Sequence, residues 1–190
     1  MVTYSSLTIC DVLNRSRVQY SDRPSLAFVG ERPLTYNELS ILVKNTSSLL
    51  LTLGVEKGDR VALLGENSPS WGVAYFAITC MGGVVVPILP DFSDVEVKNI
   101  LSHSNSKAIF ISAKQYPKLN HNGSAGSPDV ILLNNLEVVE PHSTIESSIG
   151  YNLPEPRVNV DFSDLNVCEP MEEDMAAIIY TSGTTGRSKG

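Results

Sequence analysis

Short apolar runs alternate with longer amphipathic segments over the first part of the chain. The apolar runs cover residues 60–65, 84–88, 107–112 and 130–134. The segments between them carry apolar residues at helical spacing and are long enough to form helices. Strands that alternate with helices in this way predict βαβ units joined by right-handed crossovers. We therefore expect an α/β fold, with a mostly parallel sheet covered by helices on both faces.

Two of the expected helices begin with a recognisable cap. Thr35 is followed three residues later by Glu38, and Ser93 is followed in the same way by Glu96. In such a capping box, the hydroxyl and the carboxylate each accept a hydrogen bond from the other residue's backbone N–H. The pattern predicts that helices begin just after Thr35 and Ser93.

The stretch 71–89 contains no charged residue and is long enough for a transmembrane helix. Its interior argues against that interpretation, because Gly82 and Gly83 interrupt a helix and the β-branched residues after them favour a strand. Ser68 and Pro69, just before this stretch, suit the N-cap and the first turn of a helix. We expect a helix, a turn and a buried strand, with no transmembrane segment.

Pattern and composition divide residues 1–190 into three consecutive parts. Residues 1–134 form the expected α/β core. Residues 135–174 are acidic, contain several prolines and show no clear period, so we expect an irregular connection. Residues 175–190 begin with an apolar run, predicted to be a strand over 175–180, and end in a loop rich in glycine and hydroxyl groups.

The composition restricts the possible partners. Apolar residues make up 42% and charged residues 18% of the chain, which is typical of a globular protein. The formal net charge is −7, and such a surface repels nucleic acid backbones and anionic lipid. We expect no nucleic acid partner, although a local loop can still bind one nucleotide.

Cysteine usage and the N-terminus bear on the compartment. Cys10, Cys80 and Cys168 are far apart in sequence and form no CxxC or Cys/His cluster, so we expect neither a metal site nor a disulfide framework. This usage fits a reducing compartment. The N-terminus lacks a basic start followed by an apolar stretch, which argues against a secretion signal. Together these features predict a cytoplasmic protein.

Two further features have competing interpretations. The acidic run around residues 169–174 suggests a metal site, but a solvated charge run ahead of a strand is the favoured interpretation. His103 lies late in a predicted helix, where a cation is favourable, and we interpret it as a structural or surface residue.

The chain closes with the sequence YTSGTTGRSKG, residues 180–190, which has the parts needed to hold phosphate. Glycines let backbone N–H groups turn inward, hydroxyls donate to phosphate oxygens, and Lys189 supplies a mobile positive charge. The pattern differs from the NTPase P-loop, because Lys189 neither follows a glycine directly nor precedes a hydroxyl residue. The alternative is a Ser/Gly-rich linker, but an apolar strand does not usually precede such a linker.

This closing sequence resembles the phosphate-loop signature of the adenylate-forming enzymes, which include acyl-CoA synthetases, luciferases and peptide adenylation domains. It departs from the usual form at Ser188, where proline is commoner. The segments LTYNEL (34–39), GDRVALLGENSPSWGVAYFAITCMGGVVVPI (58–88) and ILSHSNSKAIFIS (100–112) resemble other core motifs of the same family. The segments ENSPSW and GGVVVPILPDFS resemble those of long-chain fatty acid–CoA ligases most.

The resemblance implies a two-step reaction. A carboxylic acid reacts with ATP and Mg²⁺ to give an acyl-adenylate and pyrophosphate, and the thiol of coenzyme A then displaces AMP. It also implies that the following residues contact the phosphates of ATP: Thr181, Ser182, Gly183, Thr184, Thr185, Gly186 and Lys189. Thr184 or Thr185 would lie beside the magnesium ion, and we take Thr184 as the candidate. The resemblance assigns no catalytic residue to this stretch.

The resemblance implies that residues 1–190 are the N-terminal sub-domain of an AMP-binding domain. Several parts of such an enzyme do not occur in these residues. The family's adenine and ribose motifs, its acyl pocket and its C-terminal domain would all follow residue 190. We therefore expect this stretch alone to be inactive as a synthetase, with the activity belonging to a longer protein. The acyl chain length stays open. The alternative is a non-catalytic interaction or nucleotide-sensing module. A sheet that stops here can also leave an apolar edge exposed, so association through that edge is possible.

Overall fold

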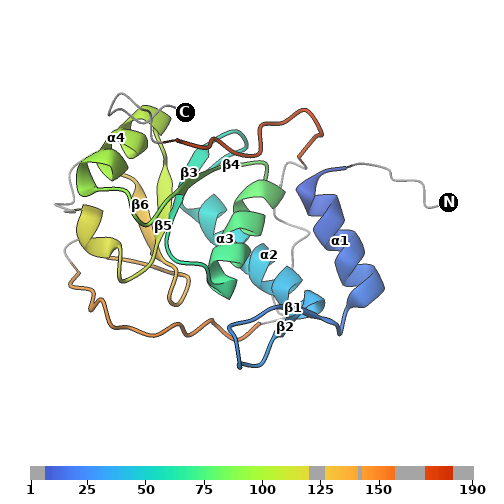
Figure 1. The fold of residues 1–190 in the computed structure, drawn as a ribbon. Helices are drawn as coiled ribbons and strands as arrows, with labels where there is room; N and C mark the ends of the chain where they lie inside the picture. Colours follow the sequence, from blue (N-terminus) through green and yellow to red (C-terminus); the bar gives the residue numbers. More distant parts are fainter. Residues whose placement is uncertain (1–6, 120–126, 141–142, 157–169, 182–190) are drawn as a thin grey trace.

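A five-stranded sheet with helices on both faces forms the centre of the molecule (Figure 1). The computed structural model describes residues 7–119, 127–140, 143–156 and 170–181. The spatial order of the strands is β4-β3-β5-β6-β7. The first four strands in this order pair in parallel, and the last pair is antiparallel. The strand bounds are β3 Arg60–Leu64, β4 Val84–Ile88, β5 Ala108–Ile111, β6 Asp129–Leu132 and β7 Glu137–Val138. The predicted α/β fold is confirmed.

Helices connect the parallel strands and cover the sheet. A separate antiparallel pair, β1 and β2, lies between the first two helices in sequence. The bounds of these elements are α1 Ile9–Tyr20, β1 Pro24–Leu26, β2 Leu34–Thr35, α2 Tyr36–Thr52, α3 Pro69–Cys80, α4 Asp94–Ser104 and the 3₁₀ turn η1 Tyr116–Leu119.

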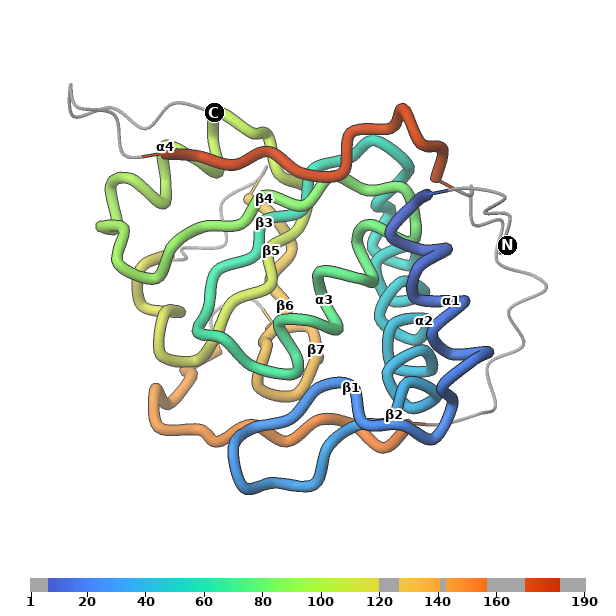
Figure 2. Tube along the Cα trace, turned by 45° about the vertical axis from the view of Figure 1, so that its right-hand side comes forward, coloured from blue at the N-terminus to red at the C-terminus, as the bar shows by residue number. Residues whose placement is uncertain are grey.

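Alternate side chains of strand β3 pack into two different hydrophobic cores. Val61 and Leu63 belong to the core under α1, α2 and α3, whereas Ala62 and Leu64 belong to the core under α4 and η1. Successive side chains of a strand point to opposite faces, so a strand buried on both faces must be apolar at every position. Figures 1 and 2 show α1, α2 and α3 on one side of the sheet and α4 on the other.

Both predicted capping boxes are confirmed. The Thr35 Oγ1 accepts a hydrogen bond from the Glu38 N–H at 3.2 Å, and Glu38 accepts one from the Thr35 N–H at 2.8 Å. Ser93 and Glu96 make the same reciprocal pair at the start of α4. Each box satisfies backbone N–H groups that the first turn of a helix leaves unpaired.

The uncharged stretch 71–89 forms a helix, a turn and a strand, as predicted. Ser68 caps α3 by accepting a hydrogen bond from the Trp71 N–H at 3.1 Å. Gly82 takes a positive φ of 79° in the turn between α3 and β4, a conformation that costs glycine little. None of the helices among the described residues combines the length and the apolar character that a membrane crossing requires. The cytoplasmic location stays a prediction.

The structure describes only part of the 135–174 segment, and the division of the chain into three parts stays a prediction. Strand β7 lies within this segment and pairs antiparallel with β6, so its beginning is more regular than we expected. The described residues between 143 and 156 contain neither helix nor strand.

Cys10 and Cys80 are distant in sequence but meet between α1 and α3. Both are free cysteines. A hydrogen bond with the Cys10 thiol, together with burial, raises the pKa of Cys80. A protonated buried thiol behaves as a small apolar group, so Cys80 packs as part of the core. Cys168 lies outside the described residues.

The capping box of α2 gives a direct test of this local structure. Thr35→Ala removes the hydroxyl that accepts the Glu38 N–H and should lower the free energy of unfolding by about 1 kcal/mol. Thr52→Ala, in the exposed last turn of the same helix, should change it by less than about 0.5 kcal/mol. Urea denaturation of both variants measures the difference. Equal losses would contradict the assigned role of the cap.

Candidate functional site

The structure describes only the first residue of the predicted phosphate loop. Thr181 is exposed and follows a buried Tyr180. The remaining predicted contacts lie outside the described residues: Ser182, Gly183, Thr184, Thr185, Gly186 and Lys189. Their roles therefore stay predictions. The described part of the site is the segment that leads to the loop, residues 170–181, which we call the lead-in segment.

The lead-in segment pairs with the edge of β4 at one position. The Val85 N–H donates to the Ala176 carbonyl at 3.0 Å, and the Ile178 N–H donates to the Val85 carbonyl at 3.0 Å. These bonds define a single parallel bridge between Val85 and Ala177. The predicted six-residue strand over 175–180 is therefore wrong in extent, although its centre does join the sheet.

A proline in β4 explains why the pairing stops there. Alternate residues of a strand direct their backbone groups to the same neighbour, so Pro87 is the next residue after Val85 to face the lead-in segment. Proline has no N–H and cannot donate to the Ile178 carbonyl. On the β3 side Pro87 removes no hydrogen bond, because its backbone nitrogen faces the lead-in segment. This fits the usual restriction of proline to the edge strands of sheets.

Side chains of the lead-in segment alternate between the core and solvent. Ile178 and Tyr180 pack in the core under α4, and Tyr180 is only 5% exposed. Ile179 is 69% exposed. Thr181 is also exposed. This period of two is that of an extended chain, and it directs Thr181 away from the core.

Tyr180 meets His103 at the C-terminal end of α4. The Tyr180 hydroxyl lies 2.6 Å from the His103 Nδ1, and the two rings are perpendicular with centroids 5.7 Å apart. Burial raises the pKa of Tyr180, so its hydroxyl keeps its proton. The tautomer of His103 sets which of the two groups donates. His103 thus makes a defined structural contact, with a residue 77 positions away in sequence.

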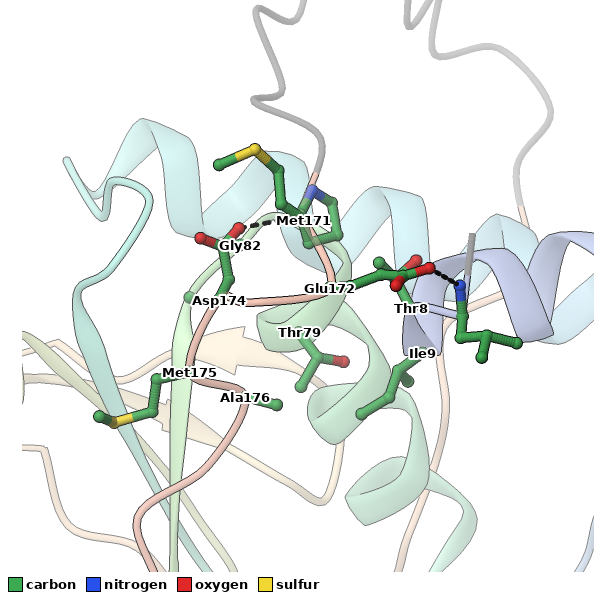
Figure 3. Close-up of a pocket in the computed structure, with 12 residues that line it drawn as sticks. Thr8, Ile9, Thr79, Gly82, Met171, Glu172, Asp174, Met175 and Ala176 are labelled. Carbon is green, nitrogen blue, oxygen red and sulfur yellow. Dashed lines mark hydrogen bonds between the residues drawn. The ribbon is translucent and has the colours of Figure 1, made fainter. Parts of the chain in front are cut away.

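Two acidic residues fasten the start of the lead-in segment. Glu172 accepts a hydrogen bond from the Leu7 N–H at 2.8 Å, as Figure 3 shows. Asp174 pairs with the Lys57 ammonium at 2.7 Å and also accepts from the Met171 N–H. The acidic run is therefore only partly a solvated surface. The described residues contain no group of His, Cys, Asp and Glu side chains arranged to hold a metal ion.

Among the described residues, the lead-in segment lines a small hollow and a larger one. The one in Figure 3, of about 120 Å³, lies between the start of α1, the turn after α3 and the segment itself. It is smaller than the usual 300–1,000 Å³ of a ligand pocket, so it does not suit a nucleotide. The second, of about 320 Å³, contains Lys57 and Arg60. Arg60 donates to the Ser104 and Asn105 carbonyls, and Lys57 pairs with Asp174. Both cations are thus engaged in structural contacts.

A separate polar cluster follows the carboxyl ends of the strands, where α/β proteins commonly bind ligands. Glu66, after β3, accepts a hydrogen bond from the Gln115 side chain at 2.7 Å. Burial works to raise the pKa of Glu66, but hydrogen bonds, chiefly from Gln115, outweigh it and leave the pKa below its ordinary value. Asn134, after β6, accepts from the Ala113 N–H and donates to the Ile149 carbonyl. The bond to Ile149, with that of the Asn152 N–H to the Asn134 carbonyl, ties residues 149–152 to the end of β6.

Sequence patterns could not have identified the contacts of the lead-in segment. The prolines and acids are visible in the sequence, but their partners Val85, Lys57 and His103 come from distant elements. The one local signal was the position of Tyr180 immediately before the glycine-rich loop. An aromatic residue there needs a buried site and a partner for its hydroxyl.

Comparison with known proteins gives a consistent result. The model of the AMP-binding enzyme family matches residues 13–190. The long-chain-fatty-acid–CoA ligase FadD13 of Mycobacterium tuberculosis is 32% identical over 157 residues, which cover 83% of this chain and 29% of that protein. The crotonobetaine/carnitine–CoA ligase of Citrobacter koseri is 28% identical, with 90% and 33% covered. The chain thus spans about a third of the length of these relatives.

A solved structure supports the fold independently. The anthranilate CoA ligase AuaEII in complex with anthranoyl-AMP matches with a TM-score of 0.76 and 19% identity. The match covers 99% of this chain and 34% of that one. At this identity the likeness concerns the fold, which agrees with the parallel sheet described above.

The ion pair of Asp174 predicts how acid affects the lead-in segment. The hydrogen bond with Lys57, followed by that with the Met171 N–H, lowers the pKa of Asp174. Its stabilising contribution is complete above the ordinary aspartate range and is lost as the pH falls through the lowered pKa. Asp174→Asn should remove this dependence and lower the protection of the Ile178 amide about three- to tenfold at neutral pH.

Hydrogen exchange of the Ile178 amide between pH 3 and pH 7, expressed as a protection factor, measures both effects. Glu173→Gln is the matched control, because Glu173 is an exposed neighbouring acid. An equal loss of protection in both variants would show that overall charge, and not the ion pair with Lys57, fastens the segment.

Proposed function

The chain belongs to the AMP-binding enzyme family, and we propose that it is the N-terminal part of an ATP-dependent acid–thiol ligase. In the first step a carboxylate oxygen attacks the α-phosphorus of ATP, and pyrophosphate leaves. In the second step the sulfur of coenzyme A attacks the acyl carbon of the adenylate, and AMP leaves with the electron pair of the broken bond. Both steps balance without an oxidant or a reductant.

The observation that carries this proposal is the loop sequence from Thr181 to Lys189, set directly after a fastened segment. Its glycines and hydroxyls provide N–H and O–H donors for the β- and γ-phosphates of ATP. Lys189 adds a positive charge that counts most as negative charge grows on the departing pyrophosphate. Lys57 and Arg60, which line a hollow beside the lead-in segment, are engaged in other contacts.

Magnesium fits the same loop. A threonine hydroxyl and phosphate oxygens are the hard oxygen ligands that Mg²⁺ prefers. We propose Thr184 as the residue beside the ion. Magnesium would neutralise phosphate charge there, in line with its general role in phosphoryl and nucleotidyl chemistry.

We propose a fatty acid as the carboxylic acid substrate. The support comes from the long-chain-fatty-acid–CoA ligases among the relatives, from Mycobacterium tuberculosis and Bacillus subtilis. The crotonobetaine/carnitine–CoA ligases among the relatives act on a polar acid instead. A comparison of fatty acids with polar acids as substrates of the complete ligase separates these classes.

Lys189 provides the main test of the phosphate role. In a ligase that contains this chain, Lys189→Ala should slow adenylation more than tenfold, about 1.4 kcal/mol of barrier or more. Lys98→Ala removes an exposed lysine of α4 and should leave the rate unchanged. ATP–pyrophosphate exchange measures the adenylation step. Equal rates for wild type and Lys189→Ala would contradict the proposal.

The length of the chain leads to a second expectation. Because it spans about a third of its relatives, we propose that adenylation needs segments outside residues 1–190. The 190-residue chain alone should then show no exchange above background under conditions in which a complete ligase reacts. Turnover by the isolated chain would contradict this expectation and leave the family assignment intact.

A further inference from the structure

We propose that His103 and Tyr180 are a positioning pair, which fixes the point where the phosphate loop leaves the folded core. This inference rests on the proposed function. Neither side chain is among the expected phosphate contacts. The pair would act through the loop by holding its first residue, Thr181, in place.

The backbone of the lead-in segment stops pairing with β4 before the loop. Within the described residues, its last backbone hydrogen bond to the sheet is that of the Ile178 N–H with the Val85 carbonyl. Pro87 removes the donor that would extend the pairing. Backbone bonding to β4 therefore ends before Tyr180.

Beyond this pairing, the Tyr180 side chain holds the segment to the core. It is the last buried side chain of the lead-in segment, and its neighbours Ile179 and Thr181 are exposed. A buried phenol hydroxyl requires a hydrogen-bond partner, and His103 supplies it at 2.6 Å.

The partner of Tyr180 belongs to a rigid part of the fold. His103 lies in the last turn of α4. The Arg60 side chain at the start of β3 donates to the carbonyls of Ser104 and Asn105, at 2.9 and 3.2 Å. The end of the helix is thus tied to the central strand. A continuous set of contacts runs from β3 through α4 to the residue before the loop.

The chemistry of the contact predicts which substitutions matter. Tyr180→Phe keeps the ring and removes only the hydroxyl. His103→Leu removes the hydrogen-bonding nitrogen, whereas His103→Asn retains a hydrogen-bonding atom at the δ position. Tyr151→Phe is the matched control, because it removes the hydroxyl of a half-buried tyrosine that packs against Phe28.

The experiment measures KM for MgATP and for the carboxylic acid in the complete ligase. Tyr180→Phe and His103→Leu should each raise KM for MgATP about three- to tenfold, with little change in KM for the acid. The double variant should lose no more than either single variant, because both changes break one contact. His103→Asn should recover most of the affinity, and Tyr151→Phe should match wild type.

A second measurement uses the 190-residue chain and needs no activity. Trypsin cleaves after Arg187 and Lys189, and a loosened anchor should speed cleavage there relative to other sites. If the wild type is active and Tyr180→Phe has a normal KM for MgATP, the positioning role of the pair is overturned and the proposed function stands. An equal rise of KM for both substrates would indicate general destabilisation and would also overturn it. A wild-type ligase without MgATP-dependent exchange would overturn the proposed function itself.

Discussion

Burial of β3 on both faces is the constraint on which the rest of the structure depends. Residues Val61 to Leu64 have no exposed surface, and β3 pairs with β4 on one side and β5 on the other. Parallel neighbours can be joined only by crossovers, and these are right-handed. Because the chain moves from β3 to β4 and then past β3 to β5, α3 and α4 must cover opposite faces. The two cores follow from this order.

The same order leaves β4 at an edge, and the lead-in segment covers it. An open strand edge invites pairing with other chains, and natural sheets limit it with prolines or short added segments. Pro87 and the bridge at Ala177 serve this purpose at β4. At the opposite side, the short antiparallel β7 covers β6. Within the described residues, neither edge is a long, flat strand, and association through an edge stays a prediction.

Sequence patterns predicted what depends on nearby residues. The strands at 60–65 and 84–88 and the caps at Thr35 and Ser93 were correct, because apolar runs and capping boxes are local signals. The strand over 175–180 was predicted too long, because its pairing depends on Pro87 of another strand. The contact between His103 and Tyr180 joins residues 77 positions apart, and single-sequence periodicity carries no such information.

The charge of the molecule sharpens the argument for a local phosphate site. Twenty-one acidic residues against fourteen basic ones give a field that repels ATP at long range. The described cations nearest the lead-in segment, Lys57 and Arg60, are held in an ion pair and a helix-end contact. The proposed binding of a triphosphate to this loop would depend on short-range donors with fixed positions, since charge attraction falls off and backbone N–H groups act only in contact. A loop of glycines and hydroxyls is effective in that role only if its starting point is fixed. Under this proposal, the anchoring of residues 176–180 is as much a part of the site as the loop sequence.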